Sequence, residues 1–310
     1  MKILFMGTPD FAVFSLEALT KTENTVIGVV TQPDKPKGRG YEMMPPPVKV
    51  FAQNAGIPTY QPKTLRDEEF ASLLSELDPD VIAVVAYGKI LPVNVLEYPK
   101  YGCINVHGSL LPEYRGAAPM QRAIIDGKSE TGITTMYMAD GIDTGDMLLK
   151  EVVKIEDNDN FEDIHDKLGA CGARLLVKTL EGLERGEIQR QPQDHSLATH
   201  AAKILKEDCL IDFSKSAKEV HDLIRGLSPI PLSFTHTPDG KMLKVVAAEV
   251  TNTDGNMGKA GEVVSLENGI TVACGKGTVR FLRVLPEGKS KMDADAFVRG
   301  RKIALGDILN

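Results

Sequence analysis

The first half of the chain alternates short apolar runs with longer stretches whose apolar residues recur at helical spacing. Residues 2–6, 26–31 and 81–86 are apolar runs typical of strands that are covered on both faces. Residues 11–19 and 66–77 are predicted helices. This alternation predicts an α/β fold with a doubly wound, mostly parallel sheet. In such sheets the ligand lies beyond the carboxyl ends of the strands, at the point where strand order reverses.

The last third of the chain has a different pattern. Short β-rich runs follow one another between residues 231 and 285, and turn signals such as Pro238-Asp239-Gly240 separate them. Several short strands at this spacing predict a small barrel. The polar stretch 185–199 has no clear period and is predicted to be a linker. We therefore expect a catalytic domain over residues 1–205 and a β-barrel domain over residues 206–310.

Composition narrows the class of protein. Hydrophobic residues make up 42% of the chain and the net charge is −7, so a core can form and a general nucleic-acid binder is disfavoured. The apolar N-terminal run goes straight into Gly7-Thr8-Pro9, too soon for a signal peptide, and no run approaches the roughly 20 residues of a membrane helix. The four widely spaced cysteines favour reduced thiols over a zinc site or a disulfide framework. We expect a cytoplasmic protein.

Two polar residues mark the end of one predicted strand. Asn105 and His107 lie two positions apart, so their side chains point to the same face, and Gly108-Ser109 follow them. An amide can stabilise a developing oxyanion, and an imidazole can accept or donate a proton. A lone histidine at a strand end is usually structural. The hypothesis of a catalytic site therefore depends on Asn105 and His107 together.

A second polar cluster lies downstream, in Asp140-Gly141-Ile142-Asp143-Thr144-Gly145-Asp146. Its glycines allow a tight loop that could bring a carboxylate up to the imidazole of His107 and stabilise its charged form. The spacing of the acids does not follow a calcium-binding loop. Taken singly, each of these residues has a more common structural explanation, because Asp/Gly clusters are usually turns, and only their combination favours a catalytic site.

These motifs resemble the signature of the formyl-tetrahydrofolate-dependent formyltransferases. The resemblance covers essentially the whole chain. The segments that carry it are Gly7–Phe11, Thr31–Asp34, Gly38–Gly40, Val85–Gly88, Asn105-x-His107, Ser109–Pro112, Arg115–Pro119 and Gly141–Asp146. It implies a Rossmann-like catalytic domain followed by an OB-like barrel.

The resemblance also implies roles for individual residues. Asn105, His107 and Asp143 would be the catalytic set, and Ser109, Leu110, Leu111 and Pro112 would line the site of the donor, 10-formyltetrahydrofolate. An amine would attack the formyl carbon, and Asn105 with protonated His107 would stabilise the oxygen of the tetrahedral intermediate. Neither a metal nor a covalent enzyme intermediate is implied.

The inserted loop 32–47 points to the branch of the family that formylates initiator methionyl-tRNA. In that branch the loop contacts the acceptor stem, and Lys35, Lys37 and Arg39 would offer phosphate contacts here. Basic residues outnumber acidic ones in residues 276–302, and Lys289, Lys291 and Arg299 would add a second tRNA surface on the barrel. Nothing in the sequence demands more than a monomer.

Two alternatives remain at this stage. A formyltransferase that acts on a small amine, such as a sugar nucleotide, would share Asn105, His107 and Asp143 but would lack the basic loop. A catalytically silent RNA-binding protein could keep the fold, although the intact set of three residues argues against it.

Overall fold

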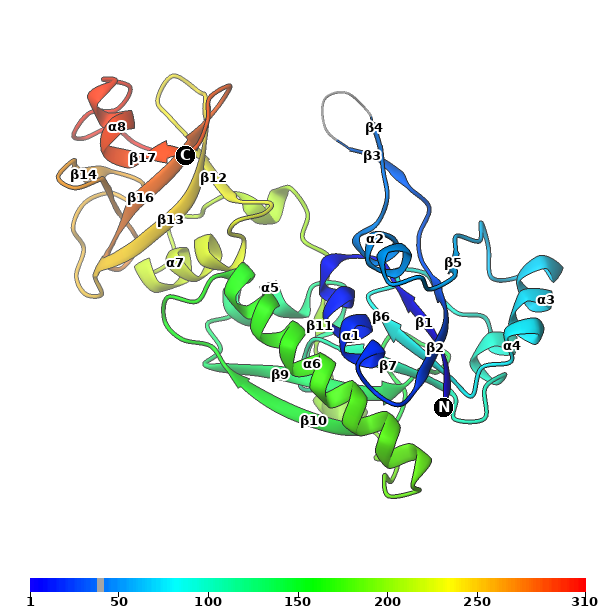
Figure 1. The fold of residues 1–310 in the computed structure, drawn as a ribbon. Helices are drawn as coiled ribbons and strands as arrows, with labels where there is room; N and C mark the ends of the chain where they lie inside the picture. Colours follow the sequence, from blue (N-terminus) through cyan, green and yellow to red (C-terminus); the bar gives the residue numbers. More distant parts are fainter. Residues whose placement is uncertain (38–41) are drawn as a thin grey trace. The chain divides into compact units, whose positions relative to one another are not determined.

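The structure is a computed structural model that describes residues 1–37 and 42–310 (Figure 1). The chain forms two compact units. The first comprises Met1–Gly116, Thr131–Val153 and His165–His200, and the second comprises Ala117–Glu130, Lys154–Ile164 and Ala201–Asn310. The domain division at residue 205 stays a prediction.

A seven-stranded sheet forms the centre of the first unit, in the order β10-β9-β7-β6-β1-β2-β5. β1 pairs in parallel with β2 and β6, and β6 pairs in parallel with β7, whereas β9 is antiparallel to β7. Strand order reverses beside β1, so the carboxyl ends of β1, β6 and β7 lie at the edge where a ligand is expected. The strands are β1 (Lys2–Gly7), β2 (Thr25–Val30), β5 (Thr59–Tyr60), β6 (Val81–Val85), β7 (Cys103–His107), β9 (Glu130–Tyr137) and β10 (Met147–Lys154).

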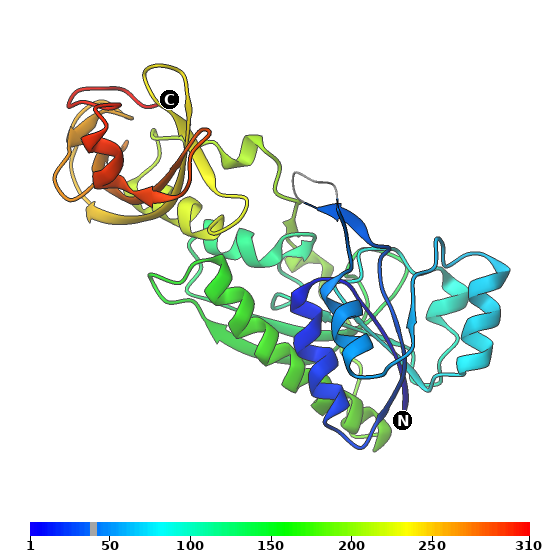
Figure 2. The same cartoon turned by 45° about the horizontal axis from the view of Figure 1, so that its top comes forward.

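Helices cover both faces of this sheet. On one face, Leu4 and Met6 of β1 pack in a buried cluster with Phe70 and Leu74 of α3 (Glu68–Leu77). The other face carries α1 (Asp10–Thr20), α2 (Pro47–Asn54) and α6 (Phe161–Glu184), and Figure 2 shows α1 running beside α6. A Cβ at Gly169 of α6 would come within 2.7 Å of the Phe14 ring, so glycine permits this close packing. The short helix α4 (Val93–Leu96) follows β6. The doubly wound sheet predicted from the sequence is confirmed.

The second unit contains an antiparallel sheet in the order β12-β13-β16-β15-β14, with β17 paired to β16. The sheet curls into a half-barrel around Val245, Val272 and Phe281, which are fully buried (Figure 2). The β-rich domain predicted from the sequence is confirmed. Its strands are β12 (Ser233–His236), β13 (Met242–Asn252), β14 (Val263–Ser265), β15 (Ile270–Ala273), β16 (Thr278–Pro286) and β17 (Met292–Asp293).

Three helices belong to this second unit in whole. They are α5 (Pro119–Ile125), α7 (Ala217–Gly226) and α8 (Ala294–Arg299). α7 begins at a capping box, in which Ser216 and Glu219 satisfy each other's backbone N–H groups. Its apolar side packs Val220 and Ile224 against the core of the half-barrel.

The structure differs from the sequence analysis in three stretches. β9 and β10 were not predicted, because their polar and apolar residues do not form a continuous run. Inside the predicted loop 32–47, β3 (Lys35–Lys37) and β4 (Glu42–Met44) form an antiparallel pair. The stretch 185–199 is not a linker: Met147 and Gln191 exchange two backbone hydrogen bonds of 2.9 Å, the 3-10 helix η1 (His195–Leu197) follows, and Gln193 is buried.

None of the helices in the described part of the chain combines the length and apolar character that crossing a lipid bilayer requires. Within residues 1–37 and 42–310, no group of three or more His, Cys, Asp or Glu side chains is placed to hold a metal ion.

Candidate active site

Asn105 and His107 lie at the carboxyl end of β7, as the sequence predicts. His107 is almost fully buried, with 5% of its surface exposed, whereas Asn105 is half-buried. The side-chain amide of Asn105 makes no hydrogen bond to any other described residue, so it is available to an incoming group. Strand pairing across β1, β6 and β7 puts Met6, Val84 and Asn105 in one row of the sheet.

The imidazole of His107 faces two different oxygen atoms. Its Nε2 lies 2.9 Å from the main-chain oxygen of Tyr114, and its Nδ1 lies 3.6 Å from Oδ2 of Asp143. Because a carbonyl oxygen can only accept, the hydrogen bond to Tyr114 places a proton on Nε2. Nδ1 is therefore the ring atom that can gain or lose a proton toward the site.

A backbone N–H group holds the carboxylate of Asp143 in place. Its Oδ2 accepts a hydrogen bond of 2.8 Å from the backbone N–H of Gly116, and its backbone is left-handed, with φ 53°. The carboxylate thus reaches the imidazole, as expected, but at a distance longer than a direct hydrogen bond. The ring is oriented by the hydrogen bond that its Nε2–H donates to the carbonyl oxygen of Tyr114, a residue that the sequence did not single out.

The segment Ser109–Pro112 follows directly and is fixed by one threonine. Thr134 of β9 donates its hydroxyl to the Ser109 carbonyl at 2.7 Å and accepts from the Leu111 N–H at 3.0 Å. Lys150 donates to the Leu111 carbonyl, and burial lowers the pKa of its ammonium group. Leu111 itself is buried against Met136 and Met147. The segment is therefore a rigid wall beside His107.

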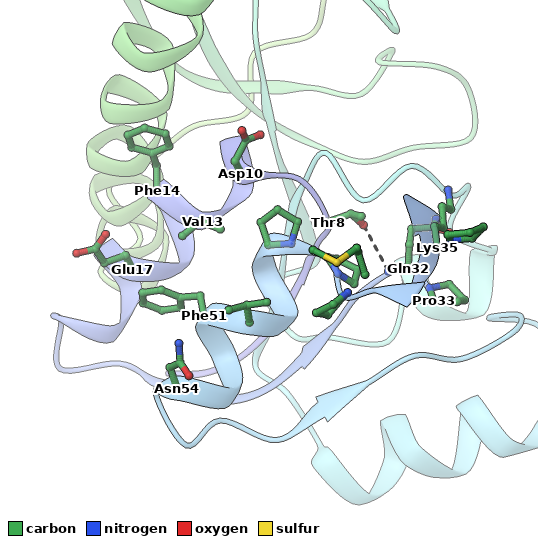
Figure 3. A pocket seen from close by; sticks show the side chains of 16 residues that line it. Thr8, Asp10, Val13, Phe14, Glu17, Gln32, Pro33, Lys35, Phe51 and Asn54 are labelled. Carbon is green, nitrogen blue, oxygen red and sulfur yellow. Dashed lines mark hydrogen bonds between the residues drawn. The ribbon is translucent and has the colours of Figure 1, made fainter. Parts of the chain in front are cut away.

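A pocket of about 800 Å³ lies on the α1 side of the sheet edge (Figure 3). Its polar end is formed by Thr8 and Gln32, which follow β1 and β2, and the Thr8 hydroxyl is hydrogen-bonded by the Gln32 N–H at 3.4 Å. The rest of the lining is mostly apolar. It consists of Val13, Phe14, Pro33, Pro36, Met44, Pro45, Pro46, Pro47, Val50 and Phe51, with Asp10, Glu17, Lys35 and Asn54 at the margins.

Four of the basic residues predicted to contact tRNA have described side chains, and all four are exposed. Lys35 is exposed on β3, and Lys289, Lys291 and Arg299 are exposed beyond β16. Arg39 lies outside the described residues, and for Lys37 only the backbone is described. The base of the hairpin is anchored by Lys49, whose ammonium group lies 2.9 Å from both carboxylate oxygens of Asp34.

Two family models match the sequence. One, described as formyl transferase, matches residues 1–180, and the other, formyl transferase, C-terminal domain, matches residues 203–302. A methionyl-tRNA formyltransferase of Pelotomaculum thermopropionicum is 46% identical over 310 residues, covering 100% of this chain and 98% of the relative. One of Geotalea daltonii is 46% identical over 306 residues, covering 99% and 97%. The chain belongs to the methionyl-tRNA formyltransferase family. The family that the motifs resembled is thereby confirmed.

Solved structures of formyltransferases share the fold. An N-formyltransferase from Helicobacter canadensis, in complex with folinic acid and dTDP-3-aminofucose, superposes with a TM-score of 0.69 at 21% identity, covering 91% of this chain and 98% of that one. HypX from Aquifex aeolicus in complex with tetrahydrofolic acid gives a TM-score of 0.62 at 17% identity, covering 97% and 47%. Structures of this fold thus bind folate derivatives.

Proposed function

We propose that this member of the methionyl-tRNA formyltransferase family transfers the formyl group of 10-formyltetrahydrofolate to the α-amino group of initiator methionyl-tRNA. The observation that carries the proposal is the His107–Asp143 pair beside the unpartnered amide of Asn105, at the carboxyl edge of the sheet. Its relatives at 46% identity over the full chain support the acceptor. We expect it to act in the cytoplasm as a monomer.

In the proposed reaction, Asn105, His107 and Asp143 each have a separate role. The α-amino nitrogen attacks the formyl carbon, forming a C–N bond and a tetrahedral oxyanion. The Asn105 amide and a proton on Nδ1 of His107 stabilise that oxygen. The amine then loses a proton, N10 of the folate gains one, and the bond between the formyl carbon and N10 breaks. Asp143, whose Oδ2 lies 3.6 Å from Nδ1, would stabilise the positive charge of the protonated imidazole and help proton movement, with water carrying the proton to and from the site.

The rigid wall Ser109–Pro112 is proposed to line the folate site. It follows His107 directly, and Thr134 fixes its backbone, so a donor bound against it would present its formyl group to Asn105 and His107.

The pocket between α1 and α2 is proposed to bind the other substrate, through the methionyl-adenosine end of the tRNA. Two strand spacings, roughly 10 Å, separate β1 from β7, and Thr8, just after β1, lies at the same carboxyl edge of the sheet as Asn105 and His107, within reach of the methionyl-adenosine end. Phe14, Phe51 and Met44 offer the soft, apolar contacts that a thioether and a base accept. Exposed Lys35 on the margin supplies a cation for the backbone phosphates, and the hairpin 32–47 with Arg39 would extend this contact along the acceptor stem.

The test is formyl transfer from 10-formyltetrahydrofolate to methionylated initiator tRNA, with methionylated elongator tRNA in parallel. We expect rapid and selective formylation of the initiator. Folate binding without transfer to either tRNA would preserve a formyltransferase with a small amine as acceptor. Tight tRNA binding with neither folate binding nor transfer would favour a silent RNA-binding protein.

A further inference from the structure

Gln193 is a buried side-chain amide next to the catalytic pair, with 7% of its surface exposed. Its Oε1 accepts two hydrogen bonds from Arg115, at 3.0 Å from Nε and 2.7 Å from Nη2. Its Nε2 donates to the carbonyl oxygens of Asp143 and Gly145, at 2.8 and 2.7 Å. A guanidinium only donates and a carbonyl only accepts, so the amide has a single possible orientation and all four of its hydrogen-bonding positions are used.

We propose that Gln193, held by Arg115, is a positioning residue that sets the place of Asp143 relative to His107. The inference rests on the proposed function, because it assumes that Asp143 works through that imidazole. It assigns a role to a residue in the stretch 185–199, where no sequence motif lies.

The turn that carries Asp143 needs such support. Asp143 adopts a left-handed backbone conformation, which aspartate tolerates better than most residues but which still costs free energy that the surroundings must offset. On one side the turn is pressed against β9, since a Cβ on Gly145 would lie 1.9 Å from the Tyr137 carbonyl oxygen. Gln193 binds the carbonyls of residues 143 and 145 and so fixes the turn by a second, independent contact.

Three consecutive residues connect this contact to the imidazole. Tyr114 accepts from Nε2 of His107, Arg115 binds Gln193, and the Gly116 N–H binds the Asp143 carboxylate at 2.8 Å. The segment Tyr114–Gly116 therefore contacts both His107 and Asp143 and fixes their positions relative to each other.

The segment itself is anchored to residue 199. The N–H of Tyr114 donates to Oγ1 of Thr199 at 2.8 Å, and the N–H of Arg115 donates to the Thr199 carbonyl at 2.9 Å. Because Gln193 and Thr199 lie on the same connection after α6, that connection holds the site from two points. The two N–H groups that the Arg115 guanidinium donates to Oε1 also polarise the amide and strengthen the hydrogen bonds that its N–H groups donate to the turn.

Gln193→Glu separates the two halves of the contact. A carboxylate of the same size still accepts from Arg115 but cannot donate to the carbonyls of Asp143 and Gly145. A displacement of about 1 Å in a catalytic group can cost ~100-fold in rate, so we expect kcat to fall about 10- to 100-fold, while KM for folate and for tRNA changes less than about threefold. Gln189→Glu, an exposed glutamine four positions earlier, makes the same charge change and should leave kcat unaltered.

The decisive measurement is a double-mutant cycle, in which Gln193→Glu is compared in the wild-type and Asp143→Asn backgrounds. The pH profile of kcat/KM is measured for each variant. If Gln193 acts through Asp143, Gln193→Glu should have less than about a twofold effect in the Asp143→Asn background, and both single variants should displace the same limb of the profile. An equal loss of kcat in both backgrounds, or a profile that Gln193→Glu only scales down, would overturn the proposal.

A second variant guards against poor folding. Arg115→Lys keeps the charge but loses the two-point contact with Oε1, and we expect the same loss of kcat and the same dependence on Asp143. Failure of the proposed function is a separate outcome, because it would show as a wild-type protein that formylates neither tRNA.

Discussion

Nε2 of His107 lies 2.9 Å from the main-chain oxygen of Tyr114, so a backbone group, and not another side chain, orients the ring. In the proposed reaction, the proton that moves is then the one on Nδ1. Removing the ring removes that proton, and His107→Ala should lower kcat by ~10²- to 10⁴-fold, the usual contribution of a positioned acid–base group. Binding of methionyl-tRNA, measured by filter retention, should stay nearly intact, and loss of binding would undercut the mechanism.

The pocket can be tested through its exposed apolar margin. Met44 and Val50 line it with 48% and 42% of their surface exposed, so a polar replacement should cost little stability. Met44→Ser together with Val50→Ser should raise KM for methionyl-tRNA about 5- to 50-fold, as expected from losing ~1–2 kcal/mol of apolar contact, and leave KM for folate unchanged. Val152→Ser, exposed on β10, is the matched control. An increase in the folate KM instead would place the donor in this pocket.

The hairpin prediction concerns charge. Arg39→Ala and Lys35→Ala should each lower kcat/KM with tRNA, and each should reduce the dependence of tRNA affinity on salt by about one phosphate contact. Folate affinity should not change, because these residues would touch only the tRNA. Lys63→Ala removes an exposed lysine of the same unit and serves as the control. Equal losses for tRNA and folate would mean that the hairpin is structural.

The basic surface of the half-barrel makes a separate contribution. Lys289, Lys291 and Arg299 are all exposed, so replacing the three by Gln should leave the melting temperature within a few degrees. We expect KM for tRNA to rise and the salt dependence to weaken by up to three contacts, with kcat at saturating tRNA unaffected. An unchanged salt dependence would show that this surface does not face the tRNA.

The four free cysteines give a prediction that depends on pH. All are buried, and burial raises the pKa of Cys103 and Cys171 to about 12 and that of Cys274 to about 11. At pH 8 the native thiols are therefore protonated, and a disulfide reagent such as DTNB should react slowly until the protein unfolds, when four thiols should titrate rapidly. Fast reaction of a native thiol at pH 8 would contradict the burial.

The same shifts set the sign of a stability effect. Between the ordinary thiol pKa of 9.0 and the raised values, the native state binds more protons than the unfolded state. The free energy of unfolding should therefore fall as the pH rises from about 9 toward 12, and the thiols should add nothing to the pH dependence below that window.

The sequence by itself determined the parallel sheet and the β-rich second part, because both depend on local patterns of apolar runs and turn residues. It also singled out Asn105, His107 and Asp143 as candidates through a motif at fixed spacing, and their catalytic roles stay a prediction. β9 and β10 escaped prediction because strands with mixed polarity give no continuous apolar signal. Only the tertiary structure decided that Tyr114 orients the imidazole and that Gln193 fixes the turn of Asp143. Those contacts join residues 7 and 50 positions apart, and a hydrogen bond donated to a backbone carbonyl leaves no trace in the type of the accepting residue.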